Sequence, residues 1–396
     1  MKHFIKILLI FWLLTLTACG AAAPEAVSPE PTIESAPVEE EAATEQEAAA
    51  QEEATSEEEA AAQEEEEAAV QEEAATEEEA AVQEEATTEE EESHSEAEAN
   101  EIEGFPVTVE VCGEPVTFDA PPERAVTNDV NITEIFLDVG LKDKLVGYSG
   151  VSDTREVGPD FREQLADVPL LSPKYIDLEA LVGAEPDFFF AGWNYGFSEE
   201  KGITPTELEK YGIKSYVLTE SCIRIMEREQ VSLEDTFTDL LNIGRIFGVE
   251  AQAQAKVDQY RAELAEISQT IGQVEQPWRV FVYDSGEESP FTAAKFAMPN
   301  AMIEAAGATN IFNDVESSWT QVNWEDVVER NPEHIVIIDY GEVSAEGKID
   351  FLKSQPELAD VEAIKNDKFV VLTYAEATPG PRNVARTRTL AEAFYP

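Results

Sequence analysis

The pattern of apolar and polar residues changes along the chain and predicts three kinds of segment. Residues 7–16 form a short apolar run behind Lys2 and Lys6. Residues 21–104 have no wide apolar face, since Glu alternates there with Ala, Gln, Thr and Ser. From residue 105 onward, short apolar strands alternate with amphipathic stretches. Only this last part is predicted to form a packed core.

The part from residue 105 onward predicts an α/β fold. A hairpin comes first, turning around Cys112 and Gly113. Strands then follow at 124–129, 144–150, 187–191, 214–218, 278–286 and 368–374, with helices at 131–140, 177–184, 232–247, 250–271 and 300–312. Ser232 is a plausible N-cap. Because strands and helices alternate, we expect parallel sheets with helices on both faces.

One unit of helix, proline and strand occurs twice. "DLEALVGAEPDFFFAGW" (177–193) returns as "WEDVVERNPEHIVIIDYG" (324–341), and both strands are apolar throughout, as strands covered on both faces are. We therefore predict two similar Rossmann-like lobes with central parallel sheets, joined by one long helix. The expected boundaries are an N-terminal lobe at 105–247, a connecting helix at 248–274 and a C-terminal lobe at 275–396.

The N-terminal apolar run predicts export. It is too short to span a bilayer, which needs about 20 residues, and a charged start before such a run is typical of a signal peptide. The run ends in Leu16-Thr17-Ala18-Cys19-Gly20, which resembles the bacterial lipobox. We expect a signal peptide at 1–18 and lipidation of Cys19; the alternative is an ordinary signal peptide with an incidental cysteine. Localisation would be the extracytoplasmic face of the cell membrane.

Charge separates the chain into two parts. Residues 21–104 contain 32 Glu and no Lys or Arg, so like charges oppose the helix that Ala and Glu otherwise favour. We interpret residues 19–104, beyond the lipidated cysteine, as a disordered tether, with an acidic partner-binding tail as the alternative. Residues 105–396 hold 52 acidic and 24 basic residues. This balance argues against a nucleic-acid partner.

Several kinds of chemistry lack their residues. The chain has only three histidines, of which His334 is the one in the lobes, so a bare transition-metal site or a histidine-held haem is not expected. We predict no metal and no resident cofactor. P-loop, Gly-x-Ser-x-Gly and Gly-x-Gly-x-x-Gly motifs are absent, and an enzyme is not expected. Cys112 and Cys222 could form one disulfide or stay as two thiols; the sequence leaves this open.

The order of motifs resembles a known family. "PERAVTNDVNITEIFLDVGLKDKLVGYSG", "DLEALVGAEPDFFFAGW", "IEAAGATNIF" and "WEDVVERNPEHIVIIDYG" are together similar to the substrate-binding proteins of ABC importers. The branch with a single helical linker includes binding proteins for iron–siderophores, haem and cobalamin. Further motifs, among them "AGWNYG", "VYDSGEESPFTA" and "YAEATPGPRN", resemble a subgroup proposed to bind a deazaflavin precursor.

The resemblance implies a ligand held between the lobes, and in open α/β sheets ligands bind beyond the carboxyl ends of the strands. Aromatic walls with a few polar groups suit a flat organic ligand or metal chelate. The candidates are Asn128, Asp129, Asn131, Trp193, Asn194, Tyr195, Glu220, Ser221, Tyr283, Asp284, Ser285, Trp319, Tyr340, Tyr374, Glu376 and, as an anion contact, Arg382. Arg155 and Arg224 are interpreted as surface groups.

The resemblance also implies partners. By motif position, Glu179 and Glu304 match the family's two glutamates that dock on the permease, whereas Glu325 is interpreted as a helix-end charge. We expect a monomer that is bound to the membrane by its lipid anchor and passes its ligand to an ABC permease with its ATPase subunits. The alternatives are a ligand sensor or scavenger without a transporter, and an enzyme on the same scaffold.

Overall fold

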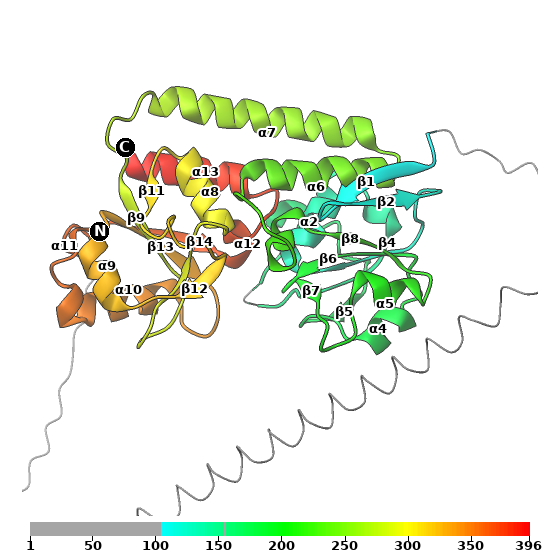
Figure 1. Cartoon of the computed structure of the whole chain (residues 1–396), viewed down its shortest axis with the longest axis horizontal. Helices are drawn as coiled ribbons and strands as arrows, with labels where there is room; N and C mark the ends of the chain where they lie inside the picture. Colours follow the sequence, from blue (N-terminus) through cyan, green and yellow to red (C-terminus); the bar gives the residue numbers. More distant parts are fainter. Residues whose placement is uncertain (1–103, 154) are drawn as a thin grey trace, which may run out of the picture. The chain divides into compact units, whose positions relative to one another are not determined.

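The computed structural model describes residues 104–153 and 155–396 (Figure 1). The predicted signal peptide, Cys19 and nearly all of the predicted tether lie outside the described residues. The described part is mixed α/β with two parallel sheets, as predicted. We refer to the part built on the first sheet as the N-terminal lobe and to the part built on the second as the C-terminal lobe.

The N-terminal lobe is built on a six-stranded parallel sheet. Its strands follow the order β5-β4-β3-β6-β7, and β8 also pairs with β6 in parallel. The strands are β3 Ala125–Asn128, β4 Leu145–Ser149, β5 Leu170–Ser172, β6 Phe188–Trp193, β7 Gly196–Phe197 and β8 Lys214–Val217. The helices are α2 Val130–Asp138, α3 Pro159–Arg162, α4 Leu178–Gly183 and α5 Pro205–Glu209, with 3-10 turns η1 Lys142–Lys144 and η2 Thr219–Arg224.

The C-terminal lobe has a four-stranded parallel sheet in the order β11-β9-β13-β14 and a separate antiparallel pair, β10 and β12. The strands are β9 Arg279–Tyr283, β10 Phe291–Ala293, β11 Thr309–Asn310, β12 Trp319–Gln321, β13 His334–Asp339 and β14 Phe369–Thr373. The helices are α8 Met298–Ala305, α9 Trp324–Arg330, α10 Ala345–Ser354, α11 Glu362–Lys365, α12 Tyr374–Ala377 and α13 Asn383–Phe394, with the 3-10 turn η3 Pro356–Leu358.

A hairpin and two helices complete the structure. The hairpin joins β1 Val107–Val111 to antiparallel β2 Glu114–Phe118. Helix α6 Leu233–Ile246 begins at Ser232, which forms a capping box with Asp235 and confirms the predicted N-cap. Helix α7 Glu250–Ile271 follows, packs against α6 and α13, and runs along one side of both lobes (Figure 1). It is the predicted long connecting helix, while the lobe boundaries themselves stay a prediction.

The lobes share a hydrophobic core on the side where α7 lies. One cluster of buried apolar residues includes Phe237 of α6, Val257 of α7, Met302 of α8 and Phe394 of α13. A second cluster, around Phe281 and Ile337, lies on the face of the C-terminal sheet opposite to Val280 and Val336 of the first cluster. The apolar packing therefore continues from the N-terminal lobe into the C-terminal lobe beside the connecting helix.

Helix α13 was not among the predicted elements. Its buried residues are spaced as one helical face, but Thr387 lies in the middle of that face and interrupts the apolar pattern. The Thr387 hydroxyl is satisfied within the helix, since it donates a hydrogen bond to the Asn383 carbonyl oxygen (2.9 Å). A buried threonine that bonds to its own helix leaves no apolar signal in the sequence.

Candidate functional site

A cleft of about 180 Å³ lies between the two lobes. The N-terminal lobe contributes Tyr175, Asn194, Tyr195 and Arg224 to its lining, and the C-terminal lobe contributes Asp284, Phe291, Trp319, Ile338, Tyr340, Tyr374, Ala377 and Thr378. Half of the lining residues are aromatic, and Phe291 and Trp319 stack with ring centroids 5.9 Å apart. The polar groups are few and come from both lobes, as in sites for organic ligands.

The loop after β6 brings Asn194 and Tyr195 to the cleft through a tight turn. Asn194 has a φ of 65°, and the Tyr195 N–H donates back to the Gly192 carbonyl oxygen (2.8 Å). Gly196 then has a φ of 125°, and a Cβ at this position would lie 2.7 Å from the Asn128 amide nitrogen. Only glycine fits here. Asn128 completes the turn by donating to the Tyr195 carbonyl oxygen (2.9 Å).

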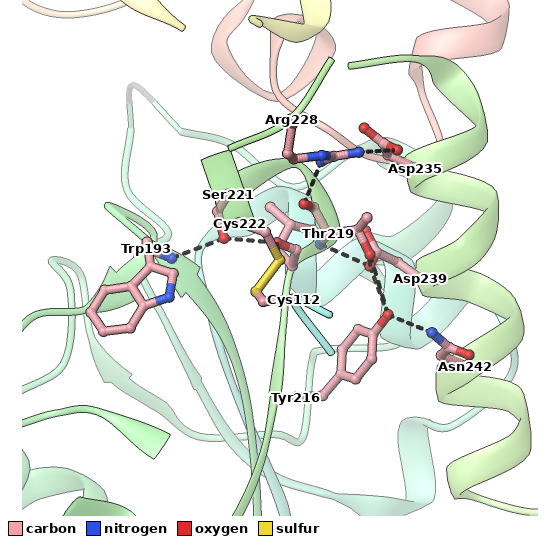
Figure 2. Close-up of a disulfide and its surroundings, with 11 residues drawn as sticks. Cys112, Trp193, Tyr216, Thr219, Ser221, Cys222, Arg228, Asp235, Asp239 and Asn242 are labelled. Atoms are coloured by element: carbon pink, nitrogen blue, oxygen red, sulfur yellow. Dashed lines mark hydrogen bonds and ion pairs between the residues drawn. A yellow bond between two sulfur atoms is a disulfide. The ribbon is translucent and has the colours of Figure 1, made fainter. Parts of the chain in front are cut away.

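The turn η2 contains Glu220 and Arg224. A disulfide and several hydrogen bonds hold this turn in place (Figure 2). Cys222 forms a disulfide with Cys112 of the β1–β2 hairpin, which settles the question that the sequence left open. Asp239 accepts hydrogen bonds from the Thr219 N–H (3.0 Å) and hydroxyl (2.6 Å). The Ser221 hydroxyl accepts from the Trp193 N–H (3.0 Å), which ties η2 to the end of β6.

Glu220 is a buried carboxyl that faces the other lobe. Its side chain is 2% exposed and accepts a hydrogen bond from the Ser318 hydroxyl (3.4 Å) of the C-terminal lobe. Burial raises the pKa of Glu220 to about 7, although the charge of Arg224 acts in the opposite direction. With its amide oxygen turned toward Arg224, Asn194 accepts from both terminal guanidinium nitrogens (3.1 and 3.2 Å).

A second group of polar residues surrounds Asp129, which is fully buried and follows β3. One carboxylate oxygen accepts hydrogen bonds from the hydroxyls of Tyr175 and Tyr374, each at 2.7 Å. Arg155 lies 3.7 Å from the same oxygen and donates to the Tyr340 hydroxyl (2.9 Å). Burial raises the pKa of Asp129, while Arg155 and the tyrosine hydroxyls act to lower it. The rings of Tyr175, Tyr340 and Tyr374 enclose the Arg155 guanidinium, and we call these three residues the tyrosine cage.

Arg382 lies in a buried ion pair between the lobes. It donates to both carboxylate oxygens of Glu134 on α2, one of them at 2.7 Å, and to the Glu156 carbonyl oxygen (2.9 Å). Glu134 is fully buried and also accepts from the Gly158 N–H (2.6 Å). Burial raises the pKa of Glu134 against the effect of Arg382. From the sequence, Arg382 is predicted to contact an anionic group of the ligand. In the structure its guanidinium is paired with the Glu134 carboxylate.

The structure places the predicted ligand residues in two groups. Asn194, Tyr195, Asp284, Trp319, Tyr340 and Tyr374 line the cleft. The others are outside the cleft lining: Asn128, Asp129, Asn131, Trp193, Glu220, Ser221, Tyr283, Ser285, Glu376 and Arg382. Among them, Asn131 donates to the Pro379 carbonyl oxygen (2.7 Å) and so bridges the lobes. Contact of any of these residues with a ligand stays a prediction.

Six residues of the cleft lining were not predicted as ligand contacts: Tyr175, Arg224, Phe291, Ile338, Ala377 and Thr378. Tyr175 was not singled out, although it follows β5 at the same sheet edge as the other candidates. Phe291 lies on β10, outside the parallel sheet whose strand ends guided the search. Arg224 was interpreted as a surface group; it is exposed, but it lines the cleft. Arg155, interpreted in the same way, is partly buried inside the tyrosine cage.

Glu179 and Glu304, the two predicted docking residues, are both exposed. Glu179 lies in the first turn of α4, and Glu304 lies near the end of α8, where it accepts from the Asn300 amide (3.1 Å). Glu325, in the first turn of α9, is exposed as well. Their exposure leaves all three carboxylates accessible to a partner protein.

Within residues 104–153 and 155–396, no group of three or more His, Cys, Asp or Glu side chains is placed to hold a metal ion. In the same residues, every helix falls short of the length and apolar character that crossing a membrane requires.

Sequence comparison finds similar proteins over most of the two lobes. A profile of the family described as "Periplasmic binding protein" matches residues 126–375. An uncharacterized ABC transporter substrate-binding lipoprotein of Bacillus subtilis is 26% identical over 299 residues, which cover 74% of this chain and 87% of that protein. A cobalamin-binding protein of Halobacterium salinarum is 27% identical over 243 residues, covering 61% of this chain and 60% of that protein.

Comparison of structures agrees with the sequences. A periplasmic binding protein from Veillonella parvula superposes with a TM-score of 0.64 at 29% identity, covering 73% of this chain and 97% of that chain. An ABC-type Fe3+-hydroxamate transport system from Saccharomonospora viridis superposes with a TM-score of 0.64 at 23% identity, covering 74% of this chain and 100% of the other, and shows a shared fold.

Proposed function

The chain belongs to the periplasmic binding protein family, and from this premise we propose that it captures an organic metal chelate or a large cofactor-like ligand between its lobes. The family consists of binding proteins, so the chain is a solute-binding protein and not an enzyme. The observation that carries the proposal is the cleft itself, whose aromatic wall is supplied by both lobes.

Three features of the cleft support a flat or ring-bearing organic ligand. Phe291 and Trp319 offer stacked ring faces, Tyr195 adds another ring, and Arg224 with Asn194 offers polar groups at the edge. Aromatic side chains bury large areas against ring systems. Names of relatives include cobalamin-binding and vitamin B12-binding proteins, which agrees with a ligand of this class. A volume of about 180 Å³ is below the usual 300–1,000 Å³ of ligand pockets, so we infer that the lobes separate to admit the ligand.

The proposed ligand class is tested with a thermal-shift screen of the full chain against ferric siderophores, cobamides, haem and deazaflavins. A ligand at 100 times its Kd adds about 2.7 kcal/mol to the free energy of unfolding, which raises the melting temperature measurably. For any compound that binds, we expect Trp319→Ala to weaken binding about 30-fold, as at a central aromatic contact. Trp278→Ala is the matched control, because Trp278 is an exposed tryptophan outside the cleft lining. Equal losses in the two variants would contradict a ligand held in this cleft.

Delivery to a transporter is the second part of the proposal. We propose that Glu179 and Glu304, both exposed, dock on an ABC permease, while a lipid on Cys19 holds the chain at the extracytoplasmic face of the membrane. Replacing both by Arg should leave ligand affinity unchanged and abolish uptake, because the carboxylates would no longer meet basic residues of the permease. Glu325→Arg, an equally exposed helix-start glutamate, is the control and should transport normally. Normal uptake by the Glu179→Arg, Glu304→Arg double variant would refute docking and favour a sensor or scavenger.

A further inference from the structure

The tyrosine cage surrounds one cation from three sides. The guanidinium carbon of Arg155 lies 4.8 Å from the ring centroid of Tyr175, 5.3 Å from that of Tyr340 and 4.5 Å from that of Tyr374. Each distance is within the range of a cation–π contact, which is attractive because the ring face is electron-rich. Tyr175 comes from the N-terminal lobe and the other two come from the C-terminal lobe, so the cage exists only where the lobes meet.

The carboxylate behind the cage also requires a cation. Asp129 is fully buried, and its carboxylate accepts hydrogen bonds from Tyr175, Tyr374 and the Val130 N–H (2.7 Å). All of these donors are neutral, so Arg155, at 3.7 Å, is the positive charge that compensates the carboxylate. A buried charge without a counter-charge is costly. A neutral or anionic group that displaced Arg155 would leave Asp129 uncompensated, whereas a cationic group would replace what it removed.

A ligand in the cleft can reach the cage. Tyr175, Tyr340 and Tyr374 line the cleft as well as enclosing Arg155. Tyr340 and Tyr374 also line a second cavity of about 340 Å³, which contains Arg162 and Glu156. The cage thus stands between two spaces that are large enough to hold small organic groups.

We propose that the tyrosine cage with Asp129 is a binding site for an organic cation, either a guanidinium or a quaternary ammonium group, and that Arg155 is its internal occupant. A ligand's cationic group takes the place of the Arg155 side chain, which moves out as the ligand enters. The proposal rests on the proposed function in one respect, that ligands enter through the cleft. Because the site is already filled, the apparent affinity for a cation is lower than the affinity of the empty cage.

The test empties the cage in the full chain with Arg155→Ala and probes it with choline, methylguanidinium and 3,3-dimethylbutan-1-ol, the neutral isostere of choline. Binding is measured by calorimetry and by the change in melting temperature. We expect the variant to bind both cations at least about tenfold more tightly than the unmodified chain does, because the competing side chain is gone. The neutral alcohol should bind detectably to neither protein. Arg162→Ala is the control, since it removes an exposed arginine beside the cage and should behave as the unmodified chain.

A second variant protects the test against a folding failure. Arg155→Gln keeps a polar side chain, removes the charge, and should also gain cation binding, while adding Tyr340→Leu to either variant should lower that binding. The proposal is overturned if Arg155→Ala and Arg155→Gln, folded by circular dichroism, bind the cations no better than Arg162→Ala. It is also overturned if the alcohol binds as well as choline. Failure of the chelate screen together with cation binding by the variants would refute only the proposed ligand class; the reverse pattern would refute only the cage.

Discussion

The two lobes meet in two regions of opposite character. One region is apolar, and Phe237, Met302 and Phe394 belong to its buried cluster. The other region is polar, and it includes Glu134 with Arg382 and the Tyr340–Tyr374 face of the tyrosine cage around Arg155. Apolar packing is insensitive to pH and hard to reopen, whereas paired charges and hydroxyls can exchange partners. We therefore expect the apolar region to hold the lobes together and the polar region to be the one that rearranges when a ligand binds.

The largest expected effect is in the apolar region. Phe394→Ala removes a ring that is 2% exposed and contacts His334 edge-on, with centroids 5.0 Å apart. We expect the free energy of unfolding to fall by about 4 kcal/mol, because the ring leaves a cavity in a packed core. Denaturant unfolding measures this loss. Val371→Ala, at a position that is 42% exposed, should change the value by less than about 0.5 kcal/mol. Comparable losses in the two variants would show that burial of the Phe394 ring is not what stabilises this region.

The next effect is in the polar region, at the ion pair of Glu134 and Arg382. Arg382→Met leaves the buried Glu134 carboxylate without its partner, and we expect a loss of about 3 kcal/mol at neutral pH. The loss should shrink as the pH falls, because Glu134 can then bind a proton and become neutral. Adding Glu134→Gln to Arg382→Met should restore part of the stability at pH 7. A loss that is independent of pH would show that packing, not charge, is what Arg382 contributes.

The smallest of the three effects is the pH dependence caused by Glu220. Its pKa is about 7 in the folded chain and near 4.5 when exposed, so the folded protein binds the proton more tightly than the unfolded chain does. Stability contributed by this proton is complete below pH 4.5 and is lost as the pH rises to 7. Over that window the loss is roughly 2–3 kcal/mol. Glu220→Gln should flatten the decline when melting temperatures are followed from pH 4.5 to 7, and the exposed Glu325→Gln should not. The pKa of Asp239 is also raised to about 7 by burial, so the melting temperature of both variants should still decline somewhat as the pH rises.

Sequence reasoning succeeded where the signal is local. The repeated unit appears as α4 with β6 and as α9 with β13, and each helix begins at a side chain that caps it: Asp177 in the first copy and Asn323 in the second. Periodicity, proline and capping residues all lie within one short stretch, so a pattern search finds them. The same holds for α6, α7 and the hairpin.

Sequence reasoning did not predict the contacts that join distant parts of the chain. The tyrosine cage brings together Arg155, Tyr175, Tyr340 and Tyr374, which lie on separate loops and strand ends, and no short motif contains them. Likewise, Arg382 follows a proline-rich loop, and its partner Glu134 lies in α2, 248 residues earlier, so the sequence around Arg382 does not reveal the ion pair. Such pairs are properties of the folded arrangement, and a single sequence carries no signal for them.

The disulfide between Cys112 and Cys222 has a topological consequence for the N-terminal lobe. Its two cysteines are 110 residues apart, and all six strands of the first sheet lie between them. The sheet is thus closed into a covalent ring. If a protease cuts the backbone once anywhere within that ring, for example in the loop between β7 and α5, the two pieces remain joined. Such a nicked chain would migrate as one species on a non-reducing gel and separate into two fragments only after the bond is reduced.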